Sequence, residues 1–422
     1  MRVLFTTQPG GTILNAMVPL AWALRAAGHD VRVASWPELA DVITRTGLTA
    51  VPVGRTQHAP PGHDDPPEEP SYPDHRGVPE PYDVIERPAA EITWDDLKAR
   101  FDAAHVTWFY KARNFPFLAD LVDFARHWRP DLVIWEPMSP AGAIAASAVG
   151  AAQVRLLWSV DYFGAARDHY RRLRDRQPAH DRVDHLADWL AAYARKYGGR
   201  FSEELVTGQA TIEQLPPSLR VAADVEYIPM RYVPYGGPAT LPKWLTAPPE
   251  RPRVALTLGQ AVVAERPDGY LVDLSDVLDA LSDVDVEVVA TIAPDAQRKL
   301  RRVPDNARVV PFLPLHALTA TCAAVIHHAG IGTMCTTTLD GVPQLALPWN
   351  SDQPALARKL AEQGAGLAIP AYRATGDAVR DSVLRLLGEP SFRERVGALR
   401  DEMLAMPTPH EVVPRLVELA AG

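Results

Sequence analysis

Residues Cys322 to Gln353 have the sequence CAAVIHHAGIGTMCTTTLDGVPQLALPWNSDQ, and this stretch decides the fold. The apolar run 323–326 predicts a buried strand, and two histidines, the turn Gly330-Ile331-Gly332 and Thr333, placed to open a helix, follow it. Unpaired backbone N–H groups and the positive end of the helix dipole would then point at one spot. Because glycines allow close approach of the backbone, and His328 and Thr333 add side-chain donors, the stretch predicts an anion site.

The spacing of the glycines narrows the kind of anion. Cys335 stands where a dinucleotide-binding fingerprint needs its third glycine, and the lysine of a phosphate-binding P-loop is missing. A nucleotide diphosphate used without hydride chemistry therefore fits better than NAD or ATP. The alternative is a plain strand–helix turn without a ligand.

The remainder of the chain alternates between short apolar runs and helical patterns. Before residue 233 we predict strands at 2–7, 31–34, 51–53, 131–135 and 154–158, and after residue 252 at 253–258, 286–291, 308–311, 323–327 and 343–347. A first helix at 14–27 would carry a core stripe of Val18, Trp22 and Ala26. Such alternation is typical of parallel sheets with crossover helices.

Two halves of this kind, joined by a stretch rich in proline and glycine, predict an α/β fold of two Rossmann-like domains that face each other across a cleft. We expect an N-terminal domain at 1–233, a linker at 234–252, a C-terminal domain at 253–405 and a C-terminal helix at 406–422 that returns to the N-terminal domain. Residues 55–93 form a long polar loop. The loop 8–12 and the turn 328–333 would face the same cleft from opposite sides.

Composition restricts the function. The net charge of −9 argues against nucleic acid, since phosphate-binding faces need clustered basic residues. Two cysteines give no disulfide framework and suit a reducing cytoplasm. No run approaches the length of a membrane span, and the N-terminus enters a strand without a signal peptide, so we expect a cytoplasmic protein with no membrane contact.

The chemistry-bearing side chains outside the turn are few. His327 and His328 are neighbours, so on a strand they point to opposite faces and cannot hold one metal together. Asp283 and Asp285 resemble a metal-holding carboxylate pair but more simply end a helix and open a strand, and we expect no metal. Asp352 and Gln353 suit sugar hydroxyls, with a helix N-cap as the alternative for Asp352.

These motifs together resemble a known family. The chain is similar to GT-B glycosyltransferases of the family-1 type, and more closely to the actinomycete enzymes that attach deoxysugars to macrolide and aromatic polyketide antibiotics. The resemblance runs the full length of the chain, through MRVLF (1–5), MVPLAWALRAAGHDVRVAS (17–35), LTAVPVG (48–54), DFARHWRPDLVIWEP (123–137), TGQATIEQLPPSLR (207–220), MRYVPYGG (230–237), LTLG (256–259), VPFLPLHAL (310–318), HHAGIGT (327–333) and GVPQLALPWNSDQ (341–353).

The resemblance implies donor-binding roles at matching positions. His328, with Gly330 and the amides of Gly332 and Thr333, would bind the diphosphate and support catalysis. Thr257 and Gly259 would approach the same phosphates, Phe312 and Leu313 would hold the nucleobase, and Asp352 and Gln353 the sugar hydroxyls. Thr336 stands where many uridine-dependent relatives carry a glutamate that binds the ribose. A dTDP-sugar co-substrate, whose nucleoside lacks the 2′-hydroxyl, is therefore expected, and no separate cofactor.

Like Thr336, a second residue differs from the family's usual pattern, and this one concerns catalysis. Ile13 occupies the position of the family's usual histidine base and cannot accept a proton. We expect Asp161 to replace it, with a helix N-cap as the structural alternative; Glu136, His58, His63 and His105 are weaker candidates. Ile13, Trp108, Trp135 and Trp158 would line an apolar acceptor pocket.

The expected function is inverting transfer of a deoxysugar to a hydrophobic polyketide-type aglycone through a C–O or C–C bond, with Ile13 favouring C–C. Alternatives are a silent paralogue that only binds and a sugar-nucleotide epimerase. Resembling enzymes often require a cytochrome-P450-like auxiliary protein, a need that the sequence neither shows nor excludes, and it also leaves a homodimer open.

Overall fold

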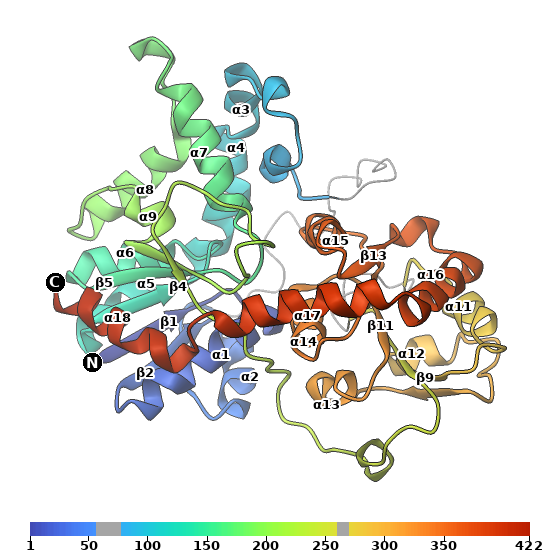
Figure 1. Cartoon of the computed structure of the whole chain (residues 1–422). Helices are drawn as coiled ribbons and strands as arrows, with labels where there is room; N and C mark the ends of the chain where they lie inside the picture. Colours follow the sequence, from blue (N-terminus) through green and yellow to red (C-terminus); the bar gives the residue numbers. More distant parts are fainter. Residues whose placement is uncertain (56–76, 260–269) are drawn as a thin grey trace.

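The computed structural model describes residues 1–55, 77–259 and 270–422 and has two parallel sheets, each with helices on both faces (Figure 1). This arrangement confirms the predicted pair of Rossmann-like α/β domains. The predicted loop 55–93 is described only from residue 77 onward, where it forms short helical turns such as η2 (Tyr82–Ile85). His58 and His63 lie outside the described residues.

The N-terminal sheet has seven strands in the order β3-β2-β1-β4-β5-β6-β7. Their bounds are β1 (Arg2–Thr6), β2 (Asp30–Ser35), β3 (Thr49–Pro52), β4 (Leu132–Trp135), β5 (Ala152–Leu156), β6 (Ala210–Glu213) and β7 (Tyr227–Pro229). The order reverses between β1 and β4, which pair in parallel from Val3 opposite Leu132. Side chains that alternate along these strands enter two separate cores, and each core is closed by its own layer of helices.

The helices of this domain divide between the two faces. Helices α1 (Gly11–Ala26) and α2 (Ala40–Arg45) cover one face. The opposite face carries α3 (Trp94–Arg100), α4 (Ala103–His105), the π-helical turn η4 (Val106–Lys111), α5 (Ala112–Trp128), α6 (Ala141–Val149), α7 (Tyr162–Arg174), α8 (His185–Lys196) and α9 (Glu204–Thr207).

The buried stripe of α1 differs from the predicted one. Val18 is buried as expected, but Trp22 is 41% exposed, and the inward-facing residues are instead Leu14, Met17 and Leu24. The indole of Trp22 lies outside the core, where it covers Gly47 and donates a hydrogen bond to the carbonyl of Thr46 over 3.0 Å. The large apolar ring alone therefore gave a wrong prediction, because a tryptophan can also cover a neighbouring turn at the surface.

The C-terminal sheet has six strands in the order β10-β9-β8-β11-β12-β13. Their bounds are β8 (Arg253–Thr257), β9 (Glu287–Thr291), β10 (Ala307–Val310), β11 (Ala324–His327), β12 (Gln344–Ala346) and β13 (Gly366–Ala368). The helices are α11 (Leu274–Ala280), α12 (Pro294–Gln297), α13 (Leu315–Thr319), α14 (Ile331–Leu339), α15 (Gln353–Glu362) and α16 (Gly376–Gly388). The order reverses between β8 and β11, which places the carboxyl ends of these two strands at the crevice where ligands bind in such sheets.

Two C-terminal helices join the domains. Helix α17 (Pro390–Ala405) packs against α14, and α18 (Pro409–Ala421) lies against α1 and β5 of the N-terminal domain (Figure 1). Val412, Val413 and Leu416 of α18 enter the core beneath α1. The core on the α5–α7 side of the N-terminal sheet extends through Tyr232 to Met334 and Cys335 of α14. The two domains therefore share buried surface rather than touching only through the linker.

Candidate active site

The anion-binding turn forms where β11 ends. Ala329 has a positive φ of 65° and is fully buried, Gly330 is the N-cap, and α14 begins at Ile331. Thr333 thus lies in the first turn rather than at the start of the helix, because helical backbone already begins at Ile331. Since no side chain caps α14, its first N–H groups are free to meet an anion.

The two histidines divide between two roles. His327 is fully buried: its Nδ1 accepts from the Ala329 N–H over 2.9 Å, and its Nε2 lies 2.8 Å from Gln344 Oε1. Burial lowers the pKa of His327 to about 3, so this ring is neutral and holds the turn in shape. His328 points to the opposite side of the strand, as alternation requires.

His328 is packed between two glycines. A Cβ at Gly259 would come within 2.7 Å of His328 Cε1, and one at Gly330 within 2.5 Å of His328 Nε2. Gly259 also has a φ of +80°, which disfavours any other residue. Burial lowers the pKa of His328 to about 4, so the ring is neutral and can offer an N–H donor rather than a positive charge.

A pocket of about 120 Å³ lies beside this turn. It is lined by Thr257, Gly259, Tyr270, Thr291, Ala293, Pro311, Phe312, Leu313 and Leu315. The structure thus brings together the four residues predicted for phosphate and nucleobase, Thr257, Gly259, Phe312 and Leu313. Sequence reasoning missed Tyr270 and Thr291. Thr291 could have been found, because it ends β9, the neighbour of β8 in the sheet.

The loop before α15 carries the residues predicted for the sugar. Asp352 occupies the N-cap position, yet its side chain makes no capping hydrogen bond. It instead accepts a hydrogen bond from Ser159 of the N-terminal domain. Gln353 Oε1 accepts from the Trp349 N–H over 3.1 Å, which orients the amide group. Burial raises the pKa of Asp352, and the Ser159 hydroxyl opposes that rise.

A second carboxylate, Glu136, lies where β4 ends in the N-terminal domain and is fully buried. Glu136 Oε1 accepts from the Gln8 N–H over 3.3 Å, and Oε2 accepts from Met138 N–H over 2.9 Å and from the Trp158 indole over 3.1 Å. Burial raises the pKa of Glu136 despite these donors. Gln8 lies two residues before the N-cap of α1, the helix that carries Ile13.

Asp161 takes the structural role that the sequence left as the alternative. Its carboxylate accepts from the Gly164 N–H over 2.9 Å and caps α7. It also pairs with Arg155 over 2.6 Å and accepts from the Tyr227 hydroxyl over 2.9 Å. Since the Asp161 carboxylate is committed to a buried ion pair with Arg155 and to the cap of α7, the geometry argues against its role as general base.

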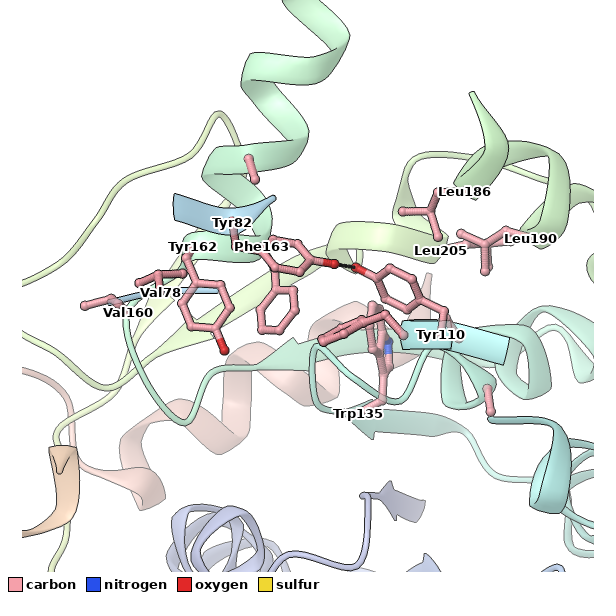
Figure 2. Packing of buried hydrophobic residues seen from close by; sticks show 14 of the residues in the cluster. Val78, Tyr82, Tyr110, Trp135, Val160, Tyr162, Phe163, Leu186, Leu190 and Leu205 are labelled. Atoms are coloured by element: carbon pink, nitrogen blue, oxygen red, sulfur yellow. Dashed lines mark hydrogen bonds between the residues drawn. The ribbon is translucent and has the colours of Figure 1, made fainter. Parts of the chain in front are cut away.

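An aromatic cavity lies on the helical side of the N-terminal domain (Figure 2). Tyr82, Tyr110, Trp135 and Phe163 surround it, with leucines from α8 and α9, and the Tyr82 hydroxyl donates to the Tyr110 hydroxyl over 2.8 Å. Its free volume is about 20 Å³, which holds about one water molecule.

The three tryptophans predicted to line the acceptor pocket lie in three different surroundings. Trp135 is buried in the cavity wall and donates to Gln153, while Trp158 contacts Glu136. Trp108 is 56% exposed on η4, beneath the guanidinium of Arg113, and does not line the cavity. Its neighbour Phe109 is the residue that faces inward, because the helical turn directs the two rings to different sides.

The remaining candidates among the described residues have other partners. His105 stacks on Phe109 and lies 3.2 Å from the Tyr82 hydroxyl, with its pKa lowered to about 4 by burial. Asp283 and Asp285 pair with Arg380 and Arg251 at the surface. Within the described residues, no three His, Cys, Asp or Glu side chains come close enough to hold a metal ion. None of the described helices is long and apolar enough to cross a bilayer.

The substitution Asp161→Asn tests whether Asp161 stabilises the fold rather than acting as the general base. Asparagine can still cap α7 but leaves the buried Arg155 without its counter-charge, so we expect a loss of about 3 kcal/mol in the free energy of unfolding. Urea denaturation measures this loss. Asp283→Asn, which breaks an exposed pair, is the control and should cost less than about 1 kcal/mol. An Asp161→Asn protein of normal stability and no activity would restore the base assignment.

Comparisons with known proteins agree with this geometry. Residues 22–259 match the N-terminal domain and residues 275–419 the C-terminal domain of the family described as erythromycin biosynthesis protein CIII-like. The 10-deoxymethynolide desosaminyltransferase of Streptomyces venezuelae is 45% identical, with 100% of this chain and 97% of the relative covered. The TDP-daunosamine transferase DnrS of Streptomyces peucetius is 43% identical, with 100% of this chain and 97% of the relative covered.

A solved structure, the glycosyltransferase VinC in complex with dTDP, superposes with a TM-score of 0.88 at 40% identity, with both chains covered completely. Family models, relatives and structure thus agree over both domains. The chain is a glycosyltransferase of the GT-B fold and belongs to the erythromycin biosynthesis protein CIII-like family.

Proposed function

We propose that this glycosyltransferase moves a deoxysugar from a dTDP-sugar to a polyketide-type aglycone, with inversion at the sugar carbon C1. The proposal rests on one observation, namely that each domain contributes a group of functional side chains to the region where the two domains meet. The free helix start, His328 and Asp352 lie in one domain, and Glu136 lies in the other, with Ser159 already in contact with Asp352. A sugar diphosphate bound to the first site would present C1 toward the second.

The donor site favours thymidine. Thr336 is buried, and its hydroxyl donates to the Gly332 carbonyl over 2.7 Å, so this position offers no carboxylate to a ribose 2′-hydroxyl. Tyr232 lies beside the same turn, where a Cβ on Gly332 would meet its hydroxyl at 3.2 Å. The binding of dTDP by VinC supports the same assignment.

The leaving group would be stabilised without a metal or a separate cofactor. Negative charge accumulates on the diphosphate as the bond to C1 breaks, and the N–H groups at the start of α14 and the neutral His328 are donors aimed at that charge. Such donors are most effective when fixed in advance, and the buried His327 fixes this turn.

We assign the general base to Glu136 rather than to Asp161. The proton of the acceptor nucleophile passes to the Glu136 carboxylate while the nucleophile bonds to C1 and dTDP departs from the opposite side. A pKa raised by burial makes this carboxylate a stronger base than one in water. Ile13, which is 8% exposed, then supplies apolar surface beside the base instead of a proton acceptor.

The aglycone would enter from the cleft toward the aromatic cavity. A drug-sized ligand needs a pocket of roughly 300 Å³ or more, whereas the cavity holds about 20 Å³. Acceptor binding must therefore move its walls. The polar groups there are already satisfied, because Arg167 forms paired hydrogen bonds with both Asp184 and Glu203, so the cavity selects apolar ligand surface.

The proposal is tested by incubating the protein with dTDP-deoxysugars and with macrolactone or anthracyclinone aglycones, and by analysing products by mass spectrometry and NMR. The assay is run alone and with a cytochrome-P450-like auxiliary protein, which resembling enzymes often require. We expect a glycoside of inverted configuration at C1. Transfer from UDP-sugars but not from dTDP-sugars, or retention at C1, would contradict the proposal.

His328→Ala should weaken dTDP binding by about tenfold, because one donor to the charged diphosphate is lost. Isothermal titration calorimetry measures the dissociation constant. His105→Ala removes a histidine from the N-terminal domain and should leave dTDP affinity unchanged. Equal affinities for His328→Ala and the wild type would refute the diphosphate role.

Glu136→Gln should reduce the turnover number by two orders of magnitude or more, roughly the contribution of a general base. Glutamine keeps the size of the side chain and one acceptor oxygen for Met138 and Trp158, but its NH2 group faces the Gln8 N–H, so the melting temperature should fall while dTDP affinity should change little. Turnover and calorimetry on the same preparation separate the two effects. A Glu136→Gln enzyme with normal turnover would exclude Glu136 as the base.

A further inference from the structure

One hydrogen bond crosses the cleft at the sugar end of the donor site. The Ser159 hydroxyl, in the loop between β5 and α7, donates to Asp352 Oδ2 in the loop before α15. Ser159 is 3% exposed, and the two residues are 193 positions apart in the chain. They meet only because the two sheets face each other with their carboxyl ends.

Asp352 is held in place for a purpose other than capping. Its side chain makes no hydrogen bond to the helix it precedes, and it takes part in none of the ion pairs formed by the described residues. The preceding Ser351 has a φ of 55°, an unfavourable backbone conformation for a residue other than glycine. The strained turn directs the carboxylate across the cleft, where Ser159 meets one of its two oxygens.

The Ser159 loop is itself fixed by the buried groups around it. The Leu157 carbonyl accepts from the Gln214 side chain over 2.8 Å, and Asp161 is anchored by Arg155 and by the first turn of α7. Tyr162 is the first residue of α7, directly after this loop, and its pKa is raised by burial and by the nearby carboxylates of Asp352 and Glu136. The loop thus connects the surroundings of Glu136 with those of Asp352.

We propose that Ser159 is a positioning residue of the donor-sugar site, which orients the Asp352 carboxylate across the cleft so that its other lone pairs receive the sugar hydroxyls. A carboxylate has about four lone-pair sites, and one serine hydroxyl fills only one of them. Recognition of the sugar is thereby linked to closure of the two domains. This inference rests on the proposed function, since it assigns Asp352 to the sugar.

The chain contains a matched control for this contact. Ser218 of the N-terminal domain donates through its hydroxyl to Glu402 Oε2 of α17 over 2.5 Å, and its N–H donates to Glu402 Oε1 over 3.0 Å. It is also a serine bonded to a carboxylate between N-terminal and C-terminal segments, but Asp352 is not involved. Ser218→Ala therefore removes a similar bond without touching the sugar site.

The experiment compares Ser159→Ala, Ser218→Ala, Asp352→Asn and the double variant Ser159→Ala/Asp352→Asn. Ser159→Ala should raise the KM for the dTDP-sugar about tenfold, as expected for a lost bond to a charged group, and should leave the dissociation constant of dTDP alone, which carries no sugar, within twofold of the wild type. Ser218→Ala should change neither. The double variant should be no worse than Asp352→Asn, because Ser159 acts through Asp352.

The following outcomes would contradict the positioning role of Ser159 or the proposed function. A normal KM for Ser159→Ala, or additive losses in the double variant, would overturn the positioning role. Weakened binding of dTDP itself would show a general structural effect and would also overturn it. If Ser159→Ala does not fold, Ser159→Cys, of similar size but with a weak donor, takes its place. A wild-type enzyme that transfers no sugar from any dTDP donor would instead contradict the proposed function.

Discussion

The proposed donor site depends on the first backbone N–H groups of α14, which no side chain of the described residues caps. At the start of α14 the chain passes from a buried strand through Ala329, with positive φ, into a helix without a side-chain cap. A helix start without a side-chain cap costs stability. The buried His327 holds the turn before α14 in shape, because its ring bonds to the Ala329 N–H and to Gln344. His327 thus supports the turn, which leaves the outward-facing His328 for the ligand.

The orientation of the two sheets does not by itself hold the carboxylates of Glu136 and Asp352 near each other. The apolar cluster that joins Tyr232 to Met334 and Cys335, and the return of α17 and α18 to the N-terminal domain, hold the sheets together from behind. Polar contacts then close the open side, among them Arg358 with Glu86 at 3.5 Å and Ser159 with Asp352. Exposed ion pairs contribute little, so the shared apolar surface supplies most of the attraction and the polar contacts set the geometry.

Local patterns predicted most strands and the turn before α14, because apolar runs, glycines and helix starts act over a few residues, but they missed the short strands β6 and β13. The positions of Thr257, Gly259, Phe312 and Leu313 around one pocket follow from the rule that ligands bind beyond the carboxyl ends of parallel strands. The misplaced residues depend on long-range contacts instead. Trp22 covers Gly47 from outside the core, and Trp108 turns outward from a π-helical turn while Phe109 turns inward. No spacing rule distinguishes these orientations.

The carboxylates of the N-terminal domain show why residue type alone could not identify the base. Asp161 and Glu136 are both fully buried at ends of neighbouring strands, yet Asp161 faces a guanidinium while Glu136 receives only neutral donors. The Asp161 carboxylate is committed to a buried ion pair and to a helix cap, whereas burial raises the pKa of Glu136 despite its neutral donors. Arg155 comes from the middle of β5, a strand whose pattern predicted only apolar burial. Thus a single buried arginine converts Asp161 into an anchor for the Ser159 loop and leaves Glu136 as the carboxylate suited to accept a proton.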